Sequence, residues 1–250
     1  MFLNLLQEIM SQKIKVVLED PQQKKLYNEK LFTVVAPCYD FVTKALSFGQ
    51  DYRWKKCLIQ SLPSKQLPYC IDLACGTGDI TFALAKKFPD GMIEGIDLTP
   101  SMLALAQAKN RYKNVLFKQH DMCQLPYPDN TIDIITGSYA LRNAPDVEQA
   151  LAEISRVLKP GGTAAFLDFS KPQNRFLQKI EYALLKGWGS VWGIMLHRDA
   201  RVYAYIAESL ATYPDRKTLR LLLNKHELEI EKTQLFLGGF LELLVCKKRK

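Results

Sequence analysis

Residues 69–79 read YCIDLACGTGD, a short apolar run that ends in a turn containing Gly76, Thr77 and Gly78. A buried strand followed directly by a glycine turn is typical of the first strand of a nucleotide-binding α/β sheet. The turn lacks the third glycine of G-x-G-x-x-G, because Thr81 stands at that position, and it lacks the Gly-Lys-Ser/Thr of a P-loop. The segment therefore predicts a nucleotide site without either of the common diphosphate signatures.

Beyond this turn, strand and helix patterns alternate along the chain. We expect strands at 69–74, 92–98, 114–119, 131–139 and 163–170, and helices at 79–88, 100–110 and 146–158. The Lys-Pro-Gly-Gly segment at 159–162 predicts a helix end and a turn before the fifth strand. Residues 228–248 predict two further strands joined at Gly238 and Gly239. The pattern thus predicts an α/β, Rossmann-like fold, with a mostly parallel seven-stranded sheet that ends in an antiparallel hairpin.

The segments outside this alternation have a different character. Residues 1–68 show helical spacing and end in the turn-rich LPSKQLP, which predicts a helical N-terminal cap or lid on a core formed by 69–250. Residues 171–213 predict a mainly helical insertion. Its aromatic side chains are interpreted either as ordinary helix core or as the walls of an apolar pocket. They are Tyr182, Trp188, Trp192, Tyr203 and Tyr205.

The composition sets limits on the class of protein. The 250 residues carry a formal charge of +8, which suits an anionic ligand, a nucleic acid or an anionic membrane and does not choose among them. Six cysteines form no C-x-x-C pair, so we expect no metal site, no disulfides and a reducing compartment. Glu8 and Lys13 interrupt the first apolar stretches, so no signal peptide is expected, and no run reaches the ~20 apolar residues of a membrane span. We therefore expect a cytoplasmic protein.

The basic ends of the chain leave two interpretations open. Lys13, Lys15 and the run at 247–250 are either solvated tails or a peripheral contact with anionic lipid. A homodimer is also left open.

Acidic positions around the glycine turn narrow the choice of nucleotide. Asp97 ends the second strand 19 residues after Gly78, where a carboxylate can hold the two hydroxyls of a ribose. Asp72 and Asp79 lie at the turn itself and would repel a diphosphate. A ligand with a ribose and a positive charge suits them better. S-adenosylmethionine carries a sulfonium and an ammonium group, so the turn favours it over NAD.

Longer segments of the chain resemble one known family. They are DLACGTGD, GIDLTPSML, LPYPDNTIDIITGSYALRN, RVLKPGG and LDFSKP, with APCYDFVTKALSFGQDYRWKK upstream and RDARVYAYIAESLATYPD downstream. These segments are similar to the ubiquinone/menaquinone biosynthesis methyltransferases, which are class I, S-adenosylmethionine-dependent C-methyltransferases. The resemblance covers about residues 28–215. Leu-Arg-Asn at 141–143 and Asp-Phe-Ser-Lys-Pro at 168–172 are specific to this family, whereas all class I methyltransferases share the glycine turn.

The resemblance implies a set of site residues. The cofactor positions of the family fall on Thr77, Asp97, Asp121, Met122 and Ser138. The remaining cofactor-binding candidates are Asp72, Ala74, Gly76, Gly78, Leu98 and Met102. In the family, Arg142 and Asn143 border the methyl-transfer centre. The stretches at 187–193 and 224–233 depart from the family's pattern in the region expected to shape the acceptor pocket.

The chemistry of a quinol acceptor gives these residues expected roles. Methyl transfer from a sulfonium is an in-line displacement that depends on proximity and alignment. A ring carbon becomes reactive when the adjacent hydroxyl loses its proton, and a cation such as Arg142 would favour the phenolate. Arginine itself stays protonated, so the expected proton acceptor is a water held by Arg142, or His197 or Tyr203. The alternative interpretation of Arg142 is a salt bridge to Asp146 or Asp121.

Three functions follow from these patterns. The leading hypothesis is C-methylation of a lipophilic, prenylated quinol, of the demethylmenaquinol type because FLGGFLELLV at 236–245 resembles naphthoquinone-specific members. The second is a specialised-metabolism methyltransferase acting on O, N or C of a small aromatic molecule. The third is a nucleic-acid-binding protein, which only the net charge suggests, because the basic residues form no stripe with interleaved aromatics.

Overall fold

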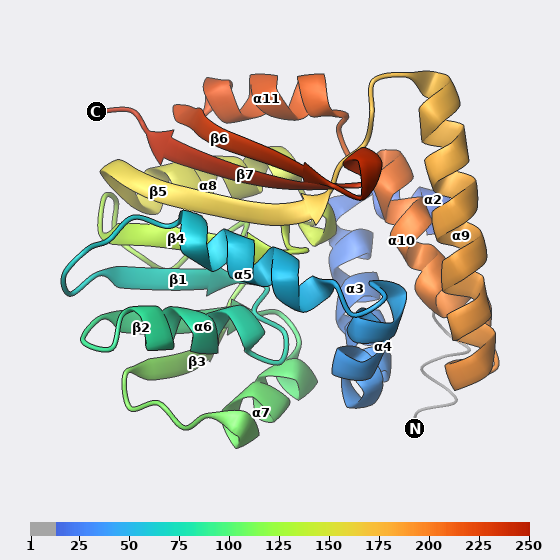
Figure 1. The fold of residues 1–250 in the computed structure, drawn as a ribbon, viewed down its shortest axis with the longest axis horizontal. Helices are drawn as coiled ribbons and strands as arrows, with labels where there is room; N and C mark the ends of the chain where they lie inside the picture. The colour runs from blue at the N-terminus through green and yellow to red at the C-terminus, as the bar shows by residue number, and fades with distance from the viewer. Residues whose placement is uncertain (1–13) are drawn as a thin grey trace.

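The computed structural model describes residues 14–250, which contain one seven-stranded sheet in the order β3-β2-β1-β4-β5-β7-β6 (Figure 1). The parallel part consists of β1 (Tyr69–Leu73), β2 (Met92–Asp97), β3 (Val115–Gln119), β4 (Ile132–Ser138) and β5 (Leu158–Phe169). β7 (Leu241–Lys248) runs antiparallel between β5 and β6 (Leu228–Phe236). The predicted mostly parallel sheet with a terminal hairpin is confirmed. Glu8 and Lys13, which carry the prediction about the start of the chain, lie outside the described residues.

The strand order reverses next to β1, which pairs with β2 on one side and with β4 on the other. The chain therefore leaves β1 and β4 in opposite directions, and a crevice opens beyond their carboxyl ends. The glycine turn at the end of β1 lies at this point.

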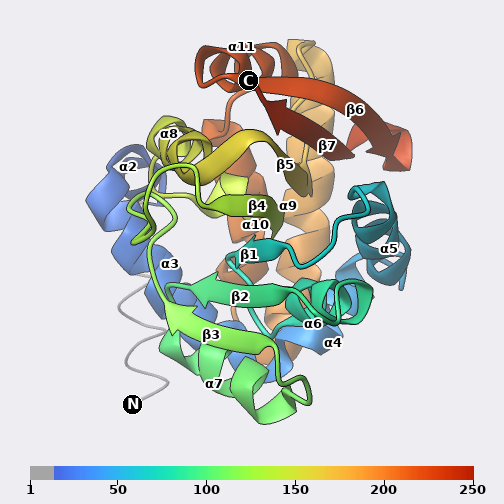
Figure 2. The same cartoon turned by 90° about the vertical axis from the view of Figure 1, so that its left-hand side faces the viewer.

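Helices cover both faces of the sheet, as the edge-on view in Figure 2 shows. On one face lie α5 (Asp51–Ser61) and α6 (Asp79–Lys87), which bury Leu58 and Leu84 against it. On the other face lie α8 (Val147–Val157) and α11 (Arg216–Lys225), which bury Leu151 and Leu219. α7 (Pro100–Lys109) packs beside β2 and β3. Because both faces are covered, the central strands are largely buried, and β4 is buried from Ile132 to Gly137.

A separate group of helices gathers at the carboxyl ends of the strands (Figure 1). Its members are α2 (Ile14–Glu19), α3 (Pro21–Val35), α4 (Tyr39–Leu46), α9 (Arg175–His197) and α10 (Arg201–Thr212). α3 begins where the Asp20 side chain accepts a hydrogen bond from the Gln23 amide, with Pro21 at its first position. Leu31 of α3 and Val202 of α10 share one buried cluster with Met102 of α7. The N-terminal helices and the helical insertion thus cover the same edge of the sheet.

α9 and α10 approach each other closely because α9 has glycine at two contact points. A Cβ atom at Gly189 would lie 2.4 Å from the carbonyl oxygen of Tyr203, and one at Gly193 would lie 2.4 Å from that of Asp199. A side chain at Gly189 would force the two helices apart, and one at Gly193 would collide with the turn between them. The close packing fixes the position of Tyr203, whose side chain faces a cavity described below.

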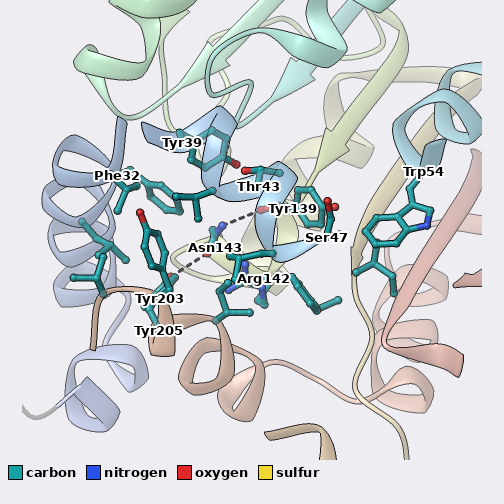
Figure 3. A pocket seen from close by; sticks show the side chains of 18 of the residues that line it. Phe32, Tyr39, Thr43, Ser47, Trp54, Tyr139, Arg142, Asn143, Tyr203 and Tyr205 are labelled. Carbon is teal, nitrogen blue, oxygen red and sulfur yellow. Dashed lines mark hydrogen bonds between the residues drawn. The ribbon is translucent and has the colours of Figure 1, made fainter. Parts of the chain in front are cut away.

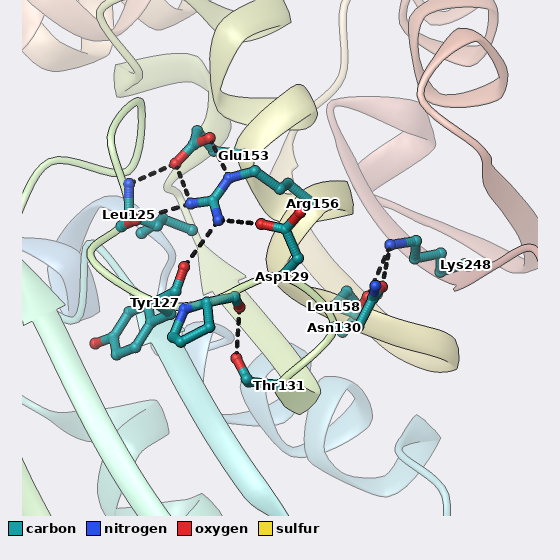
Figure 4. Close-up of polar contacts among 10 residues, drawn as sticks. Leu125, Tyr127, Asp129, Asn130, Thr131, Glu153, Arg156, Leu158 and Lys248 are labelled. Atoms are coloured by element: carbon teal, nitrogen blue, oxygen red, sulfur yellow. Dashed lines mark hydrogen bonds and ion pairs between the residues drawn. The ribbon is translucent and has the colours of Figure 1, made fainter.

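The loop between β3 and β4 is anchored by Arg156 of α8 (Figure 4). The guanidinium donates to the carbonyl oxygens of Leu125 (2.9 Å) and Tyr127 (2.8 Å) and to the carboxylates of Glu153 and Asp129 (both 2.7 Å). The loop's backbone carbonyls are therefore satisfied by one planar donor. This contact explains the Arg at the start of the family-like RVLKPGG segment.

The predicted turn at 159–162 is wrong in its placement. α8 ends at Val157 and β5 begins at Leu158, five residues before the predicted start of the strand. The pairing shifts between Ile132–Leu158 and Ile134–Thr163, so these residues form a bulge within the strand. Gly161, at φ +74°, supplies the backbone conformation that the bulge requires.

Among the described residues, no single helix is long and apolar enough to cross a bilayer, whereas the bent pair Pro21–Leu46 and Asp51–Ser61 meets the length and composition criteria when taken together.

Candidate active site

The glycine turn ties the ends of β1 and β2 together. The amide of Cys75 donates to the carbonyl of Ile96 (2.9 Å), and the amide of Gly76 donates to Oδ2 of Asp97 (2.9 Å). Oδ1 of Asp97 accepts from the amide of Thr99 (2.8 Å). Gly78, at φ +95°, is the N-cap residue that immediately precedes α6. The Asp97 carboxylate is thus fixed in orientation at the mouth of the crevice.

A cavity of about 580 Å³, partly open to solvent, lies over this turn; we call it the cofactor cavity. It is lined by Asn28, Glu29, Phe32, Tyr39, Ala74, Gly76, Asp97, Leu98, Thr99, Met102, His120, Met122, Ser138, Tyr139 and Asn143. Burial raises the pKa of the Asp97 carboxyl above its ordinary value. The predicted residues Ala74, Gly76, Asp97, Leu98, Met102, Met122 and Ser138 therefore all face one space.

The donors and acceptors of this cavity fit a nucleoside with a ribose. Each Asp97 oxygen accepts one backbone N–H and keeps a lone pair for a ribose hydroxyl. Oγ of Ser138 is buried and has no hydrogen-bond partner among the described residues, so a polar group of a ligand can satisfy it. Met102 and Met122 add an apolar wall that suits a flat base.

Four other predicted cofactor residues lie around the cavity without lining it. Thr77 donates to Oδ1 of Asp40 in α4 (2.5 Å) and faces a small neighbouring cavity of about 310 Å³. Asp72 borders the same small cavity and accepts from Thr81 (2.7 Å) and Thr136 (2.9 Å), and burial raises its pKa to about 7. The Asp121 carboxylate pairs with Lys25 (2.8 Å), and Gly78 shapes the turn through its backbone.

A second, larger cavity of about 810 Å³ adjoins the first; we call it the apolar cavity (Figure 3). Leucine, valine and aromatic side chains from α3, α4, α10 and the hairpin dominate its wall. They include Leu31, Phe32, Val35, Val42, Leu46, Trp54, Phe169, Val202, Ile206, Leu237 and Leu241. Of the predicted aromatics, Tyr203 and Tyr205 line it, whereas Tyr182, Trp188 and Trp192 do not. The insertion is thus partly pocket wall and partly packing.

The two cavities share Phe32, Tyr39, Tyr139 and Asn143. The side-chain amide of Asn143 donates to the Tyr139 carbonyl (2.8 Å), and its backbone carbonyl accepts from Asn28 (2.8 Å). The Tyr205 hydroxyl donates to Oδ1 of Asn28 (2.5 Å) and lies 3.0 Å from Oδ1 of Asn143. Asn143 is therefore held rigidly at the junction where a ligand in one cavity meets a ligand in the other.

Arg142 is buried against the apolar cavity, and its carboxylate partner differs from both predicted alternatives. Nε lies 3.6 Å from Oδ1 of Asp168, and Nη1 donates to Ser209. The guanidinium carbon lies 5.3 Å from the Phe169 ring and 5.8 Å from the Tyr205 ring. The predicted bridge to Asp146 or Asp121 is wrong, since Asp146 begins α8 with its side chain bonded to the Gln149 amide and Asp121 pairs with Lys25.

Tyr203 and His197 form a hydrogen-bonded pair at the wall of the apolar cavity. Nε2 of His197 lies 2.8 Å from the Tyr203 hydroxyl and 3.6 Å from Sγ of Cys38. Burial lowers the pKa of His197 below its usual 6.5, and burial raises the pKa of Tyr203 well above its usual 10. Both side chains are therefore neutral at pH 7. Tyr203 lines the cavity, and His197 lies behind it.

Sequence reasoning missed several residues that hold the site together. Asp168 and Ser209 bind Arg142, Asn28 and Tyr205 bind Asn143, and Phe32 lies at the junction. Asp168, Tyr205 and Ser209 lie within the family-like segments LDFSKP and RDARVYAYIAESLATYPD, and this location could have marked them as site residues. Nothing in the sequence pattern distinguished Phe32 from an ordinary core position of α3.

Comparison with known proteins gives a consistent group of relatives. The sequence profile of the ubiE/COQ5 methyltransferase family matches residues 20–247. A demethylmenaquinone methyltransferase from Lactobacillus johnsonii is 35% identical over 233 residues, which span 88% of this chain and 93% of that protein. A 2-phytyl-1,4-naphtoquinone methyltransferase from Thermosynechococcus vestitus is 36% identical over 223 residues, with 88% and 98% coverage.

Solved structures share the fold at lower identity. A SAM-dependent methyltransferase from Thermotoga maritima, described as a possible histamine N-methyltransferase, superposes with a TM-score of 0.64 at 16% identity, covering 89% of this chain and all of that one. This similarity extends the fold assignment to the whole sheet and its covering helices.

Proposed function

Because the chain belongs to the ubiE/COQ5 methyltransferase family, we propose that it methylates a ring carbon of a prenylated naphthoquinol. It is an S-adenosylmethionine-dependent methyltransferase. The two relatives described above are named for demethylmenaquinone and 2-phytyl-1,4-naphthoquinone, which supports a naphthoquinol acceptor. We place the enzyme in the cytoplasm, where it would reach its lipophilic acceptor at a membrane surface.

One observation carries the proposal: the cofactor cavity and the apolar cavity lie side by side and share Asn143 and Tyr139 in their walls. Among the described residues that line the apolar cavity, Arg142 alone is charged. An apolar chamber with one buried cation matches an acceptor with a hydrocarbon tail and a ring that gains negative charge. A small polar acceptor would leave most of this wall without contacts.

We assign each residue of the cofactor cavity a role in binding S-adenosylmethionine. Asp97 holds the ribose, Ser138 supplies a hydrogen bond, and Ala74, Leu98, Met102 and Met122 form the apolar walls. S-adenosylmethionine, when bound, supplies a methyl group on a positively charged sulfur. Gly76 and Gly78 keep the turn close to the ligand. Asp72, Thr77 and Asp121 position the turn and the neighbouring loop through the side chains that they bind.

Arg142 promotes the reaction by stabilising charge. A naphthol hydroxyl has an ordinary pKa near that of a phenol, and an adjacent buried guanidinium lowers it by favouring the phenolate. Asp168 and Ser209 hold the guanidinium so that it meets the ring without rearrangement. Asn143 orients the ring toward the cofactor cavity.

The Tyr203–His197 pair is the proposed route for the released proton. Tyr203 faces the acceptor, and neutral His197 lies behind Tyr203. The Tyr203 hydroxyl accepts the proton of the quinol while it donates its own proton to His197. Once the methyl group has bonded to the ring carbon, the hydrogen of that carbon leaves as a proton and the ring oxygen regains one. The net change is transfer of one proton from the acceptor to His197, and Tyr203 keeps its own proton count.

The test uses purified enzyme, S-adenosylmethionine with a labelled methyl group and a panel of reduced acceptors. Prenylated 1,4-naphthoquinol should be labelled fastest, prenylated benzoquinol more slowly, and catechol or small polyketide phenols not at all. Labelling of the small phenols, with the prenylated quinols unlabelled, would contradict the proposal and favour a specialised-metabolism enzyme.

A further inference from the structure

The outer face of α9 is apolar over its whole length, although it faces away from the rest of the protein. Phe176, Leu184 and Met195 are 70%, 57% and 65% exposed. Further exposed apolar side chains on this helix are Leu177, Ile180, Val191, Ile194 and Leu196. An ordinary surface helix presents polar side chains on its outer face, so this helix requires a partner or a surface to cover it.

Aromatic contacts extend this face onto α4. The Phe48 ring stacks on Trp188 at 5.1 Å between centroids, and the Phe41 ring packs edge-on against Trp192 at 5.9 Å. Phe41 and Phe48 are themselves 56% and 73% exposed. α9 stands at the right-hand edge of Figure 1 with α4 beside its lower half. We call the outer face of α9 together with Phe41 and Phe48 the docking surface.

The exposed charges of α9 are all positive, and the exposed acidic residue of α4, Asp40, is paired with Lys109 of α7. The exposed charged residues of α9 are Arg175, Lys179 and Lys186, of which Lys186 also pairs with Glu208. The acidic residue of this helix, Glu181, points inward and is 3% exposed. Arg198 follows the helix, and Lys44 and Arg53 lie exposed on α4 and α5. An apolar helical face bordered by Lys and Arg is typical of segments that lie in the interface of an anionic membrane.

The docking surface borders the apolar cavity. The indole N–H of Trp188 donates to the carbonyl of Leu46 (3.4 Å), and Leu46 lines the cavity. Leu237, at the tip of the hairpin, also lines the cavity and is 50% exposed, so this side of the cavity reaches the molecular surface. A hydrocarbon tail in a bilayer in contact with α9 would therefore lie close to the cavity.

We propose that the docking surface binds the anionic face of a lipid bilayer, with α9 lying in the headgroup region and the apolar cavity turned toward the lipid. The inference rests on the proposed function in one respect, that the acceptor resides in the bilayer. A second copy of the chain is a poorer occupant, because a two-fold contact through this face would bring two sets of cations together.

Flotation of the purified full chain with lipid vesicles tests the inference. Vesicles that contain phosphatidylglycerol should bind the enzyme, vesicles of phosphatidylcholine alone should bind it weakly, and salt should weaken the binding. The double variant Leu184→Ser/Met195→Ser should lose binding by roughly tenfold for each side chain that the lipid would bury. The control Leu116→Ser/Leu221→Ser removes equally exposed apolar side chains from β3 and α11 and should bind like the parent.

Charge reversal separates the lipid contact from non-specific adhesion. Arg175→Glu/Lys179→Glu should reduce binding to the anionic vesicles by roughly fivefold per charge, whereas Lys113→Glu/Lys217→Glu, on other faces, should have a small effect. Equal losses in the two charge variants would show that net charge alone drives binding and would overturn the inference.

Two further readouts separate this inference from the proposed function. Methylation of a short-chain, water-soluble naphthoquinol should be unchanged in the α9 variants. If the parent methylates that quinol but binds no vesicles, or if it sediments as a dimer that Leu184→Ser/Met195→Ser dissociates, the docking surface is not a lipid contact. If the parent binds vesicles through α9 but methylates no quinol, the proposed function fails and the lipid contact stands.

Discussion

We predict that cofactor binding depends most directly on Asp97. Its carboxylate is oriented by two backbone amides and keeps lone pairs for the two ribose hydroxyls. Asp97→Ala removes both hydrogen bonds to a charged acceptor, each contributing roughly 1.5–3 kcal/mol, so affinity for S-adenosylmethionine should fall by roughly 10²-fold to 10⁴-fold. Titration calorimetry measures this change. Asp90→Ala, at an exposed carboxylate before β2, is the matched control, and an equal loss there would contradict the role of Asp97.

Two variants separate the proposed catalytic role of Arg142 from its structural role. Arg142→Met should lower kcat by about a hundredfold or more, because charge on the ring is no longer stabilised. It should also lower the free energy of unfolding by about 3–5 kcal/mol, because Asp168 is left buried without its cation. Arg142→Met/Asp168→Leu should recover part of the stability and none of the activity. Recovery of activity with stability would show that Arg142 acts only by supporting the fold.

His197 gives the reaction a predictable pH dependence. Burial lowers its pKa in the folded protein below 6.5, so kcat should fall as the pH drops through that lowered value and the imidazole becomes charged. The free energy of unfolding also falls as the pH drops. Below about pH 6.5 the unfolded chain takes up the proton first, so the free energy of unfolding decreases as the pH falls.

His197→Gln keeps a hydrogen-bonding side chain near Tyr203, but glutamine cannot accept a proton between pH 5 and pH 8. The acidic limb of the kcat profile should disappear in this variant, and kcat itself should fall roughly 10²-fold or more. Stopped-flow methylation rates between pH 5 and pH 8 measure both effects. An unchanged acidic limb would assign the titration to another group.

The expected positions of residues at the strand ends follow from local spacing. Asp97 ends β2 and Ser138 ends β4, and both strands pair with β1, so strand pairing alone brings the two residues to one crevice. The partner of Arg142 could not be read in the same way, because Asp168 lies on a different strand 26 residues along the chain. Only the packing of the β4 and β5 ends selects Asp168 over the acidic residues nearer in sequence.

At the scale of elements, the glycines of α9 determine how the pocket wall is assembled. Gly189 has the Tyr203 carbonyl 2.4 Å from its would-be Cβ, whereas a Cβ at Gly187 on the same helix meets nothing within 4 Å. Gly189→Ala should therefore destabilise the fold by about 1–3 kcal/mol, and Gly187→Ala should stabilise it by up to about 1 kcal/mol through helix propensity. Thermal unfolding of the two variants measures the difference, and equal melting temperatures would contradict the close α9–α10 contact.

The elements themselves followed closely from periodicity. The helices and strands of 69–157 begin and end within about two residues of their predicted positions, because buried parallel strands and amphipathic helices have distinct patterns. The predicted start of β5 was wrong, because Lys-Pro-Gly-Gly at 159–162 has the local pattern of a helix end and a turn. Its bulge is formed by pairing with β4, which no local pattern encodes.

At the scale of the whole molecule, we propose that the sheet binds the cofactor and that the helices at its carboxyl edge select the acceptor. α3, α4, α9 and α10 come from both ends of the sequence and enclose the apolar cavity together. The sequence predicted both helical segments but not that they share one core, because contacts between distant helices leave no periodic signal. This division explains how one sheet can serve different acceptors when the helices over its edge change.

The position of the transferred methyl group tests the account most directly. Reduced prenylated demethylnaphthoquinone is incubated with the enzyme and S-adenosylmethionine carrying a ¹³C methyl group, and the product is examined by NMR and mass spectrometry. The account predicts one ¹³C methyl on the free ring carbon beside a hydroxyl, with the quinone still able to cycle between its oxidised and reduced forms. A ¹³C methoxy signal, or no ¹³C in the quinone while S-adenosylmethionine is consumed on another acceptor, would contradict it.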